Sequence, residues 1–205
     1  DLILFEGKEM TLNYAIPLVN GTVINTAEQN FKVNKISENV LAMALELPNG
    51  ASMTQTYTIK EGSYELDYDV VFDKIASVVA PNNRYAELKW TTAIQGQEKT
   101  LKDERAATTI YYRYGTDDEV DYLSETSSDD EELHANVQWV SFKQKFFNQT
   151  LINKGQFVET GTKIEIIEVE EDDAVLVKKA KAHCKRGDVF QLVLSRQFQQ
   201  QYKGD

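Results

Sequence analysis

The stretch Ser52–Phe72, SMTQTYTIKEGSYELDYDVVF, decides the fold class of this chain. Its first half alternates, with Met53, Gln55, Tyr57 and Ile59 on one side and threonines on the other. Its second half places Tyr64, Leu66, Tyr68, Val70 and Phe72 on one face and acidic residues on the other. A period of two residues predicts strands, and the turn around Gly62 joins them into an antiparallel hairpin with one packed and one wet face.

Further strands are predicted on both sides of the hairpin. Tyr85–Ile94 alternates in the same way, and Thr108–Tyr114 is rich in β-branched and aromatic residues. Turn residues punctuate the chain at Asn20-Gly21, Pro48–Gly50 and Gly115. Short strands at this spacing are typical of a mainly β fold, a sandwich or a barrel.

The stretch Thr109–Ile152, TIYYRYGTDDEVDYLSETSSDDEELHANVQWVSFKQKFFNQTLI, breaks this pattern. Its acidic part, 117–132, cannot form a core and is predicted to be a loop. On a helical wheel, apolar residues that follow the acidic part fall in one arc, among them Trp139, Phe142, Phe146 and Phe147. This spacing predicts an amphipathic helix near 137–151. This arc is expected to pack on the sandwich or to face a partner.

Lys143 lies inside the same apolar arc. Its stem can run along the aromatic side chains with the ammonium in water, or the ammonium can pair with a carboxylate. We expect the second arrangement, an ion pair that holds the predicted helix to the sandwich. Loss of one partner of a buried pair costs about 3–5 kcal/mol.

Composition excludes several functional classes. The chain has 205 residues and a formal net charge of −11, which argues against nucleic-acid binding, because a phosphate backbone requires a basic surface. One cysteine, Cys184, permits no intrachain disulfide. No apolar run reaches the roughly 18 residues of a membrane-spanning helix. The chain opens mid-pattern at Asp1, so we expect a piece of a longer protein whose membrane segments lie outside it.

No residue pattern predicts a catalytic, metal or cofactor site. The acidic clusters 117–121 and 129–132 lack the glycine and spacing of a calcium loop. With 33 acidic residues, no one pair is distinguished as glycosidase carboxylates. His134 stands alone, and the adjacent His183 and Cys184 have no second cluster that would complete a zinc site. Nucleotide-binding and nucleophile-elbow motifs are absent.

Aromatic residues leave a binding alternative open. Tyr57, Trp90, Tyr112 and Tyr114 are the candidates for lining a cleft that would hold a sugar or an extended peptide. A carbohydrate-binding or mutarotase-like domain is therefore the second function class.

Four segments resemble the large periplasmic domain of YidC-type membrane protein insertases in its Bacteroidetes form. They are Leu4–Gly7 (LFEG), Gln55–Tyr68, Thr109–Tyr112 with Asp118–Ser124 (DEVDYLS), and Gln138–Phe147 (QWVSFKQKFF). They follow the family's order over residues 1–152, and the last is the most specific.

The resemblance implies an antiparallel β-supersandwich similar to galactose mutarotase-like domains, on the periplasmic face of the bacterial inner membrane. It implies no mutarotase activity, because function belongs to the site and not to the fold. The implied role is non-enzymatic, with no cofactor. The implied partners are accessory subunits of the Sec translocon and nascent membrane proteins, with membrane attachment only through transmembrane segments outside this chain.

The resemblance changes after Ile152. Residues 155–178 are similar to the small β-barrel tail of NfeD-like proteins, and 180–205 to a segment of anthranilate synthase component one. We therefore expect a boundary near 152, with 153–179 and 180–205 as short segments of separate origin. A chorismate-acting enzyme would rest on the last segment alone.

Overall fold

The computed structural model describes residues 10–81, 86–95, 101–116, 118–154, 161–167 and 189–192. The chain forms two compact units. Unit 1 comprises 1–13 and 87–200, and unit 2 comprises 14–86 and 201–205. The predictions about His183 and Cys184 lie outside the described residues.

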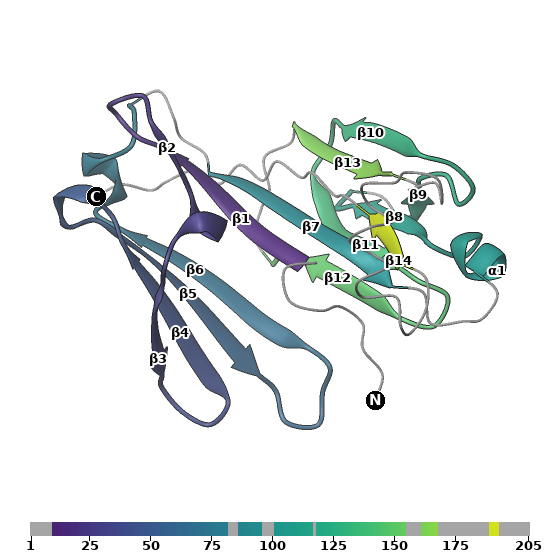
Figure 1. The fold of residues 1–205 in the computed structure, drawn as a ribbon, viewed down its shortest axis with the longest axis horizontal. Coiled ribbons are helices and arrows are strands. Elements are labelled where there is room, and N and C mark those ends of the chain that lie inside the picture. Colours follow the sequence, from purple (N-terminus) through teal and green to yellow (C-terminus); the bar gives the residue numbers. More distant parts are fainter. Residues whose placement is uncertain are drawn as a thin grey trace. The chain divides into compact units, whose positions relative to one another are not determined.

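Unit 2 is built on one antiparallel sheet with the strand order β3-β4-β5-β6 (Figure 1). Its strands are β3 (Lys32–Lys35), β4 (Val40–Glu46), β5 (Ser52–Ile59) and β6 (Leu66–Asp73). Short 3-10 turns lie at Thr26–Glu28, Pro48–Gly50 and Ile75–Ser77. The predicted hairpin is confirmed, because β5 and β6 pair in an unbroken register from Ser52↔Asp73 to Ile59↔Leu66.

Strand β1 (Met10–Pro17) begins in unit 1 and continues into unit 2, where it pairs with β2 (Val23–Asn25). The sheet that contains it has the order β14-β7-β1-β2. The buried Thr26 accepts a 2.7 Å hydrogen bond from the Tyr14 N–H at its hydroxyl, which ties the end of β2 to β1. Ile16 and Met53 are fully buried and mark the core of unit 2.

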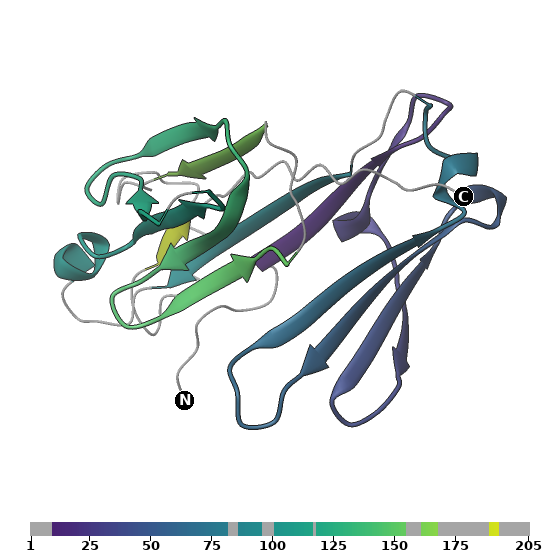
Figure 2. The same cartoon turned by 180° about the vertical axis from the view of Figure 1, so that it is seen from behind.

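Unit 1 contains a further four-stranded sheet with the order β12-β11-β8-β9 (Figure 2). Its strands are β8 (Thr109–Tyr114), β9 (Asp121–Tyr122), β11 (Val137–Lys143) and β12 (Asn148–Ile152). A separate ribbon pairs β10 (Asp129–Leu133) with β13 (Thr162–Ile166). The remaining elements are β7 (Glu87–Gln95), β14 (Val189–Leu192) and the helix α1 (Leu101–Arg105).

The core of unit 1 joins side chains from these separate sheets. Trp90 on β7 meets Phe142 on β11 with ring centroids 4.1 Å apart in an edge-to-face arrangement. Ile110 and Val140 come from the same sheet as Phe142, while Ile164 comes from β13, and all are fully buried. Apolar faces of different sheets thus pack on one another, as in a sandwich. The predicted mainly β, antiparallel fold class is confirmed.

The predicted helix near 137–151 is wrong. Two strands occupy this region, β11 and β12, and the turn between them is closed by the Gln144 N–H, which donates to the Phe147 carbonyl at 2.7 Å. The pairing of β11 with β8 shifts between Val137 and Trp139, as at a β-bulge. A bulge breaks the two-residue period of a strand. Together with the tight turn, it gave the apolar residues of this region the spacing of a helix face.

The prediction of a continuous acidic loop over 117–132 is also wrong in part. Residues 129–133 form β10, whose partner β13 lies about thirty residues further along the chain. The carboxylates of β10 alternate between half-buried and exposed positions, and Leu133 at its end is fully buried. Lys163 on β13 pairs with Asp130 at 3.2 Å and offsets part of the acidic charge.

Candidate functional site

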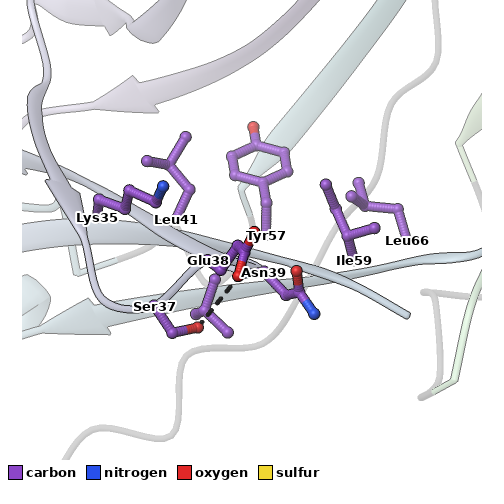
Figure 3. A pocket seen from close by; sticks show the side chains of 9 residues that line it. Lys35, Ser37, Glu38, Asn39, Leu41, Tyr57, Ile59 and Leu66 are labelled. Carbon is purple, nitrogen blue, oxygen red and sulfur yellow. Dashed lines mark hydrogen bonds between the residues drawn. The ribbon is translucent and has the colours of Figure 1, made fainter. Parts of the chain in front are cut away.

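A surface hollow lies at one end of the unit 2 sheet, where the β3–β4 turn meets the β5–β6 hairpin. We call it the tip groove. Its volume is about 260 Å³, and its lining residues are Lys35, Ser37, Glu38, Asn39, Val40, Leu41, Tyr57, Ile59 and Leu66. Figure 3 shows Lys35, Leu41, Tyr57, Ile59 and Leu66 rising from the same side of the sheet. The groove is therefore the open end of one sheet face.

Strand alternation explains why the groove is apolar. Met53, Tyr57 and Ile59 lie on the same face of β5, because successive side chains of a strand point to opposite sides. Along this face the exposed fraction rises from 0% at Met53 to 56% at Ile59. Leu66, the register partner of Ile59, is 49% exposed. This face of β5, which also carries the buried Gln55, is thus covered at one end and open at its apolar end.

Tyr57 lies where the open end begins and packs against Tyr68 of β6. The rings of Tyr57 and Tyr68 lie 4.9 Å apart across β5 and β6, and the Tyr57 hydroxyl donates to Gln55 Oε1 at 2.7 Å. Burial raises the pKa of Tyr14 to about 12 and also raises the pKa of Tyr57 and Tyr68. All three hydroxyls are therefore neutral at physiological pH, so these tyrosines carry no charge.

Charges at the tip lie on the hairpin turn and the groove rim. Lys60 Nζ lies 3.1 Å from Glu65 Oε2 and 3.4 Å from Asp67 Oδ2. The hydrogen bond to Glu65, together with Asp67, raises the pKa of Lys60. These contacts fasten the two sides of the hairpin turn. Lys35 and Glu38, of opposite sign, are the charged residues among those that line the groove.

The aromatic residues predicted as a helix face do not form one surface. Phe142 is fully buried in the core of unit 1, whereas Phe146 in the β11–β12 turn is 60% exposed. Trp139 is half-buried and pairs in register with Arg113 of β8 and Ile152 of β12. Phe147, at the end of the turn, is half-buried as well.

Lys143 forms the contacts expected of a partly buried cation, but from a strand. Its Nζ donates to the Ala107 carbonyl at 2.8 Å and lies 3.8 Å from Glu125 Oε1 and 5.5 Å from the centre of the Tyr111 ring. Both side chains of the ion pair are 35% exposed. Solvent screens such a pair, so it contributes about 1 kcal/mol or less.

The four candidate cleft aromatics are not gathered at one site. Tyr57 belongs to the tip groove of unit 2. Trp90 and Tyr112 are core residues of unit 1, with 7% and 1% of their surface exposed, and Tyr114 packs against that core. The Tyr112 hydroxyl donates to Glu131 Oε2 at 2.7 Å. Burial, together with this hydrogen bond, raises the pKa of Tyr112.

Sequence reasoning missed the aliphatic part of the groove. Ile59 and Leu66 were assigned to strand faces and not to a site. The available signal was an apolar residue on each side of the Gly62 turn, at the tip of a hairpin where no neighbouring strand covers it. Ile36 in the β3–β4 turn, 60% exposed, follows the same pattern.

Comparison with known proteins assigns the chain to a family. The sequence model of the YidC periplasmic domain matches residues 3–183. The chain belongs to the YidC periplasmic domain family. The resemblance seen in the four segments is thereby confirmed, and the domain lies at the periplasmic face of the bacterial inner membrane. The match continues past Ile152, so the boundary expected there stays a prediction.

Curated relatives include the membrane protein insertase YidC of Parabacteroides distasonis, 31% identical over 160 residues, which are 78% of this chain and 25% of the relative. YidC of Porphyromonas gingivalis strain W83 is 29% identical over 76% of this chain and 25% of its own length. YidC of Bacteroides fragilis is 23% identical over 79% of this chain and 26% of its own length. The chain spans about a quarter of the length of these relatives. No solved structure matches it.

The described residues contain no helix with the length and apolar character needed to cross a membrane. Within the same residues, no group of three or more His, Cys, Asp or Glu side chains is placed to hold a metal ion.

Proposed function

We propose that this domain is a non-enzymatic, partner-binding part of a membrane protein insertase. Its tip groove holds an apolar segment of a nascent membrane protein during insertion and folding. Accessory subunits of the Sec translocon are the second partner class. The observation that carries the proposal is the open apolar end of the β3–β6 sheet in unit 2.

Exposure of neighbouring aliphatic side chains supports this role. Contiguous apolar surface on a protein with polar surroundings marks an interaction site, because water contact with such a surface is unfavourable. Ile59, Leu66 and Ile36 are each about half exposed or more, around one hollow or in the turn beside it. A membrane protein segment is rich in the aliphatic side chains that complement this surface.

Groove size favours a polypeptide over a small molecule. Its volume of about 260 Å³ is below the roughly 300–1,000 Å³ of typical small-molecule sites. Tyr57 is the one aromatic residue among those that line it. The other candidate sugar-binding aromatics lie elsewhere, and Trp90 and Tyr112 are buried, so nothing favours the carbohydrate-binding alternative.

The proposal predicts a large loss of client binding when the groove becomes charged. In the full-length insertase, Ile59→Asp combined with Leu66→Asp is expected to lower client recovery in a pull-down about tenfold, since a loss of roughly 1.4 kcal/mol in binding has this effect. The residues are exposed, so folding should be retained, which circular dichroism checks.

Val23→Asp is the matched control for this experiment. Val23 is 53% exposed in the same unit, on β2, and does not line the groove. It should leave client recovery unchanged. Equal recovery by the wild type and by the double groove variant would refute a binding role for the tip groove.

A further inference from the structure

Strand β6 is an outer strand of its sheet in the part of the chain that the structure describes. It has eight residues, and its register with β5 shows no bulge. In an antiparallel pair every second residue directs its N–H and C=O away from the neighbour, so roughly four residues of β6 present them at the edge. Such an edge is a template for a further strand.

The two faces of β6 differ in chemistry. Leu66, Tyr68, Val70 and Phe72 continue the apolar face that ends in the tip groove. On the opposite face lie Asp67, Asp69, Val71 and Asp73, paired in register with Thr58, Thr56, Thr54 and Ser52 of β5. Asp67 is paired with Lys60, whereas Asp69 and Asp73 are exposed and form no ion pair among the described residues.

We infer that the β6 edge binds an extended partner segment in which apolar and basic residues alternate. This inference rests on the proposed partner-binding role and specifies the chemistry of the partner. A strand added to β6 places its own alternate side chains beside those of β6 on each face. Apolar side chains on one face would extend the groove surface, and lysine or arginine on the other would neutralise Asp69 and Asp73.

The same aspartates disfavour a second copy of the chain as the occupant. Antiparallel pairing of β6 with another β6, with both apolar faces on one side, brings aspartates opposite one another. An example is the register that places Asp67 opposite Asp69. Like charges directly opposite one another destabilise a strand pair. Charge therefore selects a basic partner and opposes self-association.

Fluorescence anisotropy with the 205-residue chain and labelled eight-residue peptides tests the inference. The probe is a capped peptide of alternating lysine and valine. Two comparison peptides are used. The first carries glutamate in place of lysine. The second keeps lysine and valine but has N-methylated backbone amides. The first comparison removes the charge match, and the second keeps the charge but removes the N–H groups that pair with an edge. We expect both to bind at least about tenfold more weakly, a loss of roughly 1.4 kcal/mol.

A charge exchange identifies the residues. Asp69→Lys with Asp73→Lys should weaken binding of the lysine peptide about tenfold and strengthen binding of the glutamate peptide. The matched control, Asp103→Lys, changes an exposed carboxylate on α1 of unit 1 and should leave both affinities unaltered. Amide hydrogen exchange should show slower exchange in β6 when the lysine peptide is bound.

Equal binding of the N-methylated and unmodified peptides would overturn the inference, because attraction of charge alone would explain it. Absence of peptide binding, together with loss of client recovery in the groove variants, would overturn the inference that the β6 edge binds a partner. The proposed role of the groove would still be supported. Selective peptide binding with unchanged client recovery in those variants would support the edge and overturn the groove's role.

Discussion

Replacing Phe142 with alanine is expected to lower the free energy of unfolding by about 3–5 kcal/mol, the usual cost of removing a buried phenylalanine. Phe142 is fully buried on β11, and its ring packs edge-to-face on Trp90. The substitution leaves a cavity between two sheets of unit 1. Because domains are stable by only about 5–15 kcal/mol, a large part of the stability would be lost. Urea or thermal unfolding measures this change.

Phe146→Ala provides the control and distinguishes two structures. Phe146 lies in the β11–β12 turn and is 60% exposed, so its loss should change stability by no more than about 0.5 kcal/mol. In a helix, residues 142 and 146 would share one face, since positions four apart are neighbours. Similar losses at both positions would therefore contradict the hairpin and favour a helix.

Ile164→Ala is expected to destabilise unit 1 by about 2–5 kcal/mol, as for other buried aliphatic residues. Ile164 lies on β13, is fully buried, and belongs to the same core as Phe142 and Leu133. It follows the boundary predicted at Ile152, so the substitution tests whether the later segment is part of the folded unit. Chemical denaturation followed by the fluorescence of Trp90 and Trp139, both in unit 1, reports the effect.

Ile167 supplies the comparison for this experiment. It is 39% exposed, three residues further along the chain, and Ile167→Ala should cost well under about 1 kcal/mol. If Ile164→Ala were as mild as Ile167→Ala, and proteolysis released a stable fragment ending near residue 152, β13 would not belong to the core. A boundary at Ile152 would then be supported.

The hairpin of β5 and β6 could be predicted because local signals agreed. Alternation fixed the strands, and Gly62, with a φ of 70°, occupies the left-handed region that favours glycine in the turn. The same reasoning failed at 137–152, where β-branched and aromatic residues indicated strands but a bulge and a short turn disturbed the period. In that region β propensity was the better guide than the helical wheel.

Strand β10 could not be predicted from its own residues. A run of four acidic residues, Asp129–Glu132, has low β propensity, and its strand conformation depends on pairing with β13. That pairing includes Glu132↔Lys163 in register. Long-range partners of this kind override local preference, and they are not visible in a single sequence.

The tip groove was only partly visible in the sequence. Ile59 and Met53 occupy the same face of β5, and only the nearness of Ile59 to the Gly62 turn distinguishes them locally, yet one is 56% exposed and the other fully buried. Which end of a strand face is covered depends on the tertiary arrangement. The family could be recognised from motifs, whereas the surface that supports a binding role required the structure.

Site-specific crosslinking tests the central claim, that the tip groove contacts partner chains, most directly. A photoreactive amino acid at Leu66, which lines the groove, is introduced into the full-length insertase in membranes that synthesise an inner-membrane protein. The same probe at Val23 is the control. We predict crosslinks from position 66 to the nascent chain or to a translocon subunit, well above those from position 23. Equal or absent crosslinking at the two positions would contradict the account.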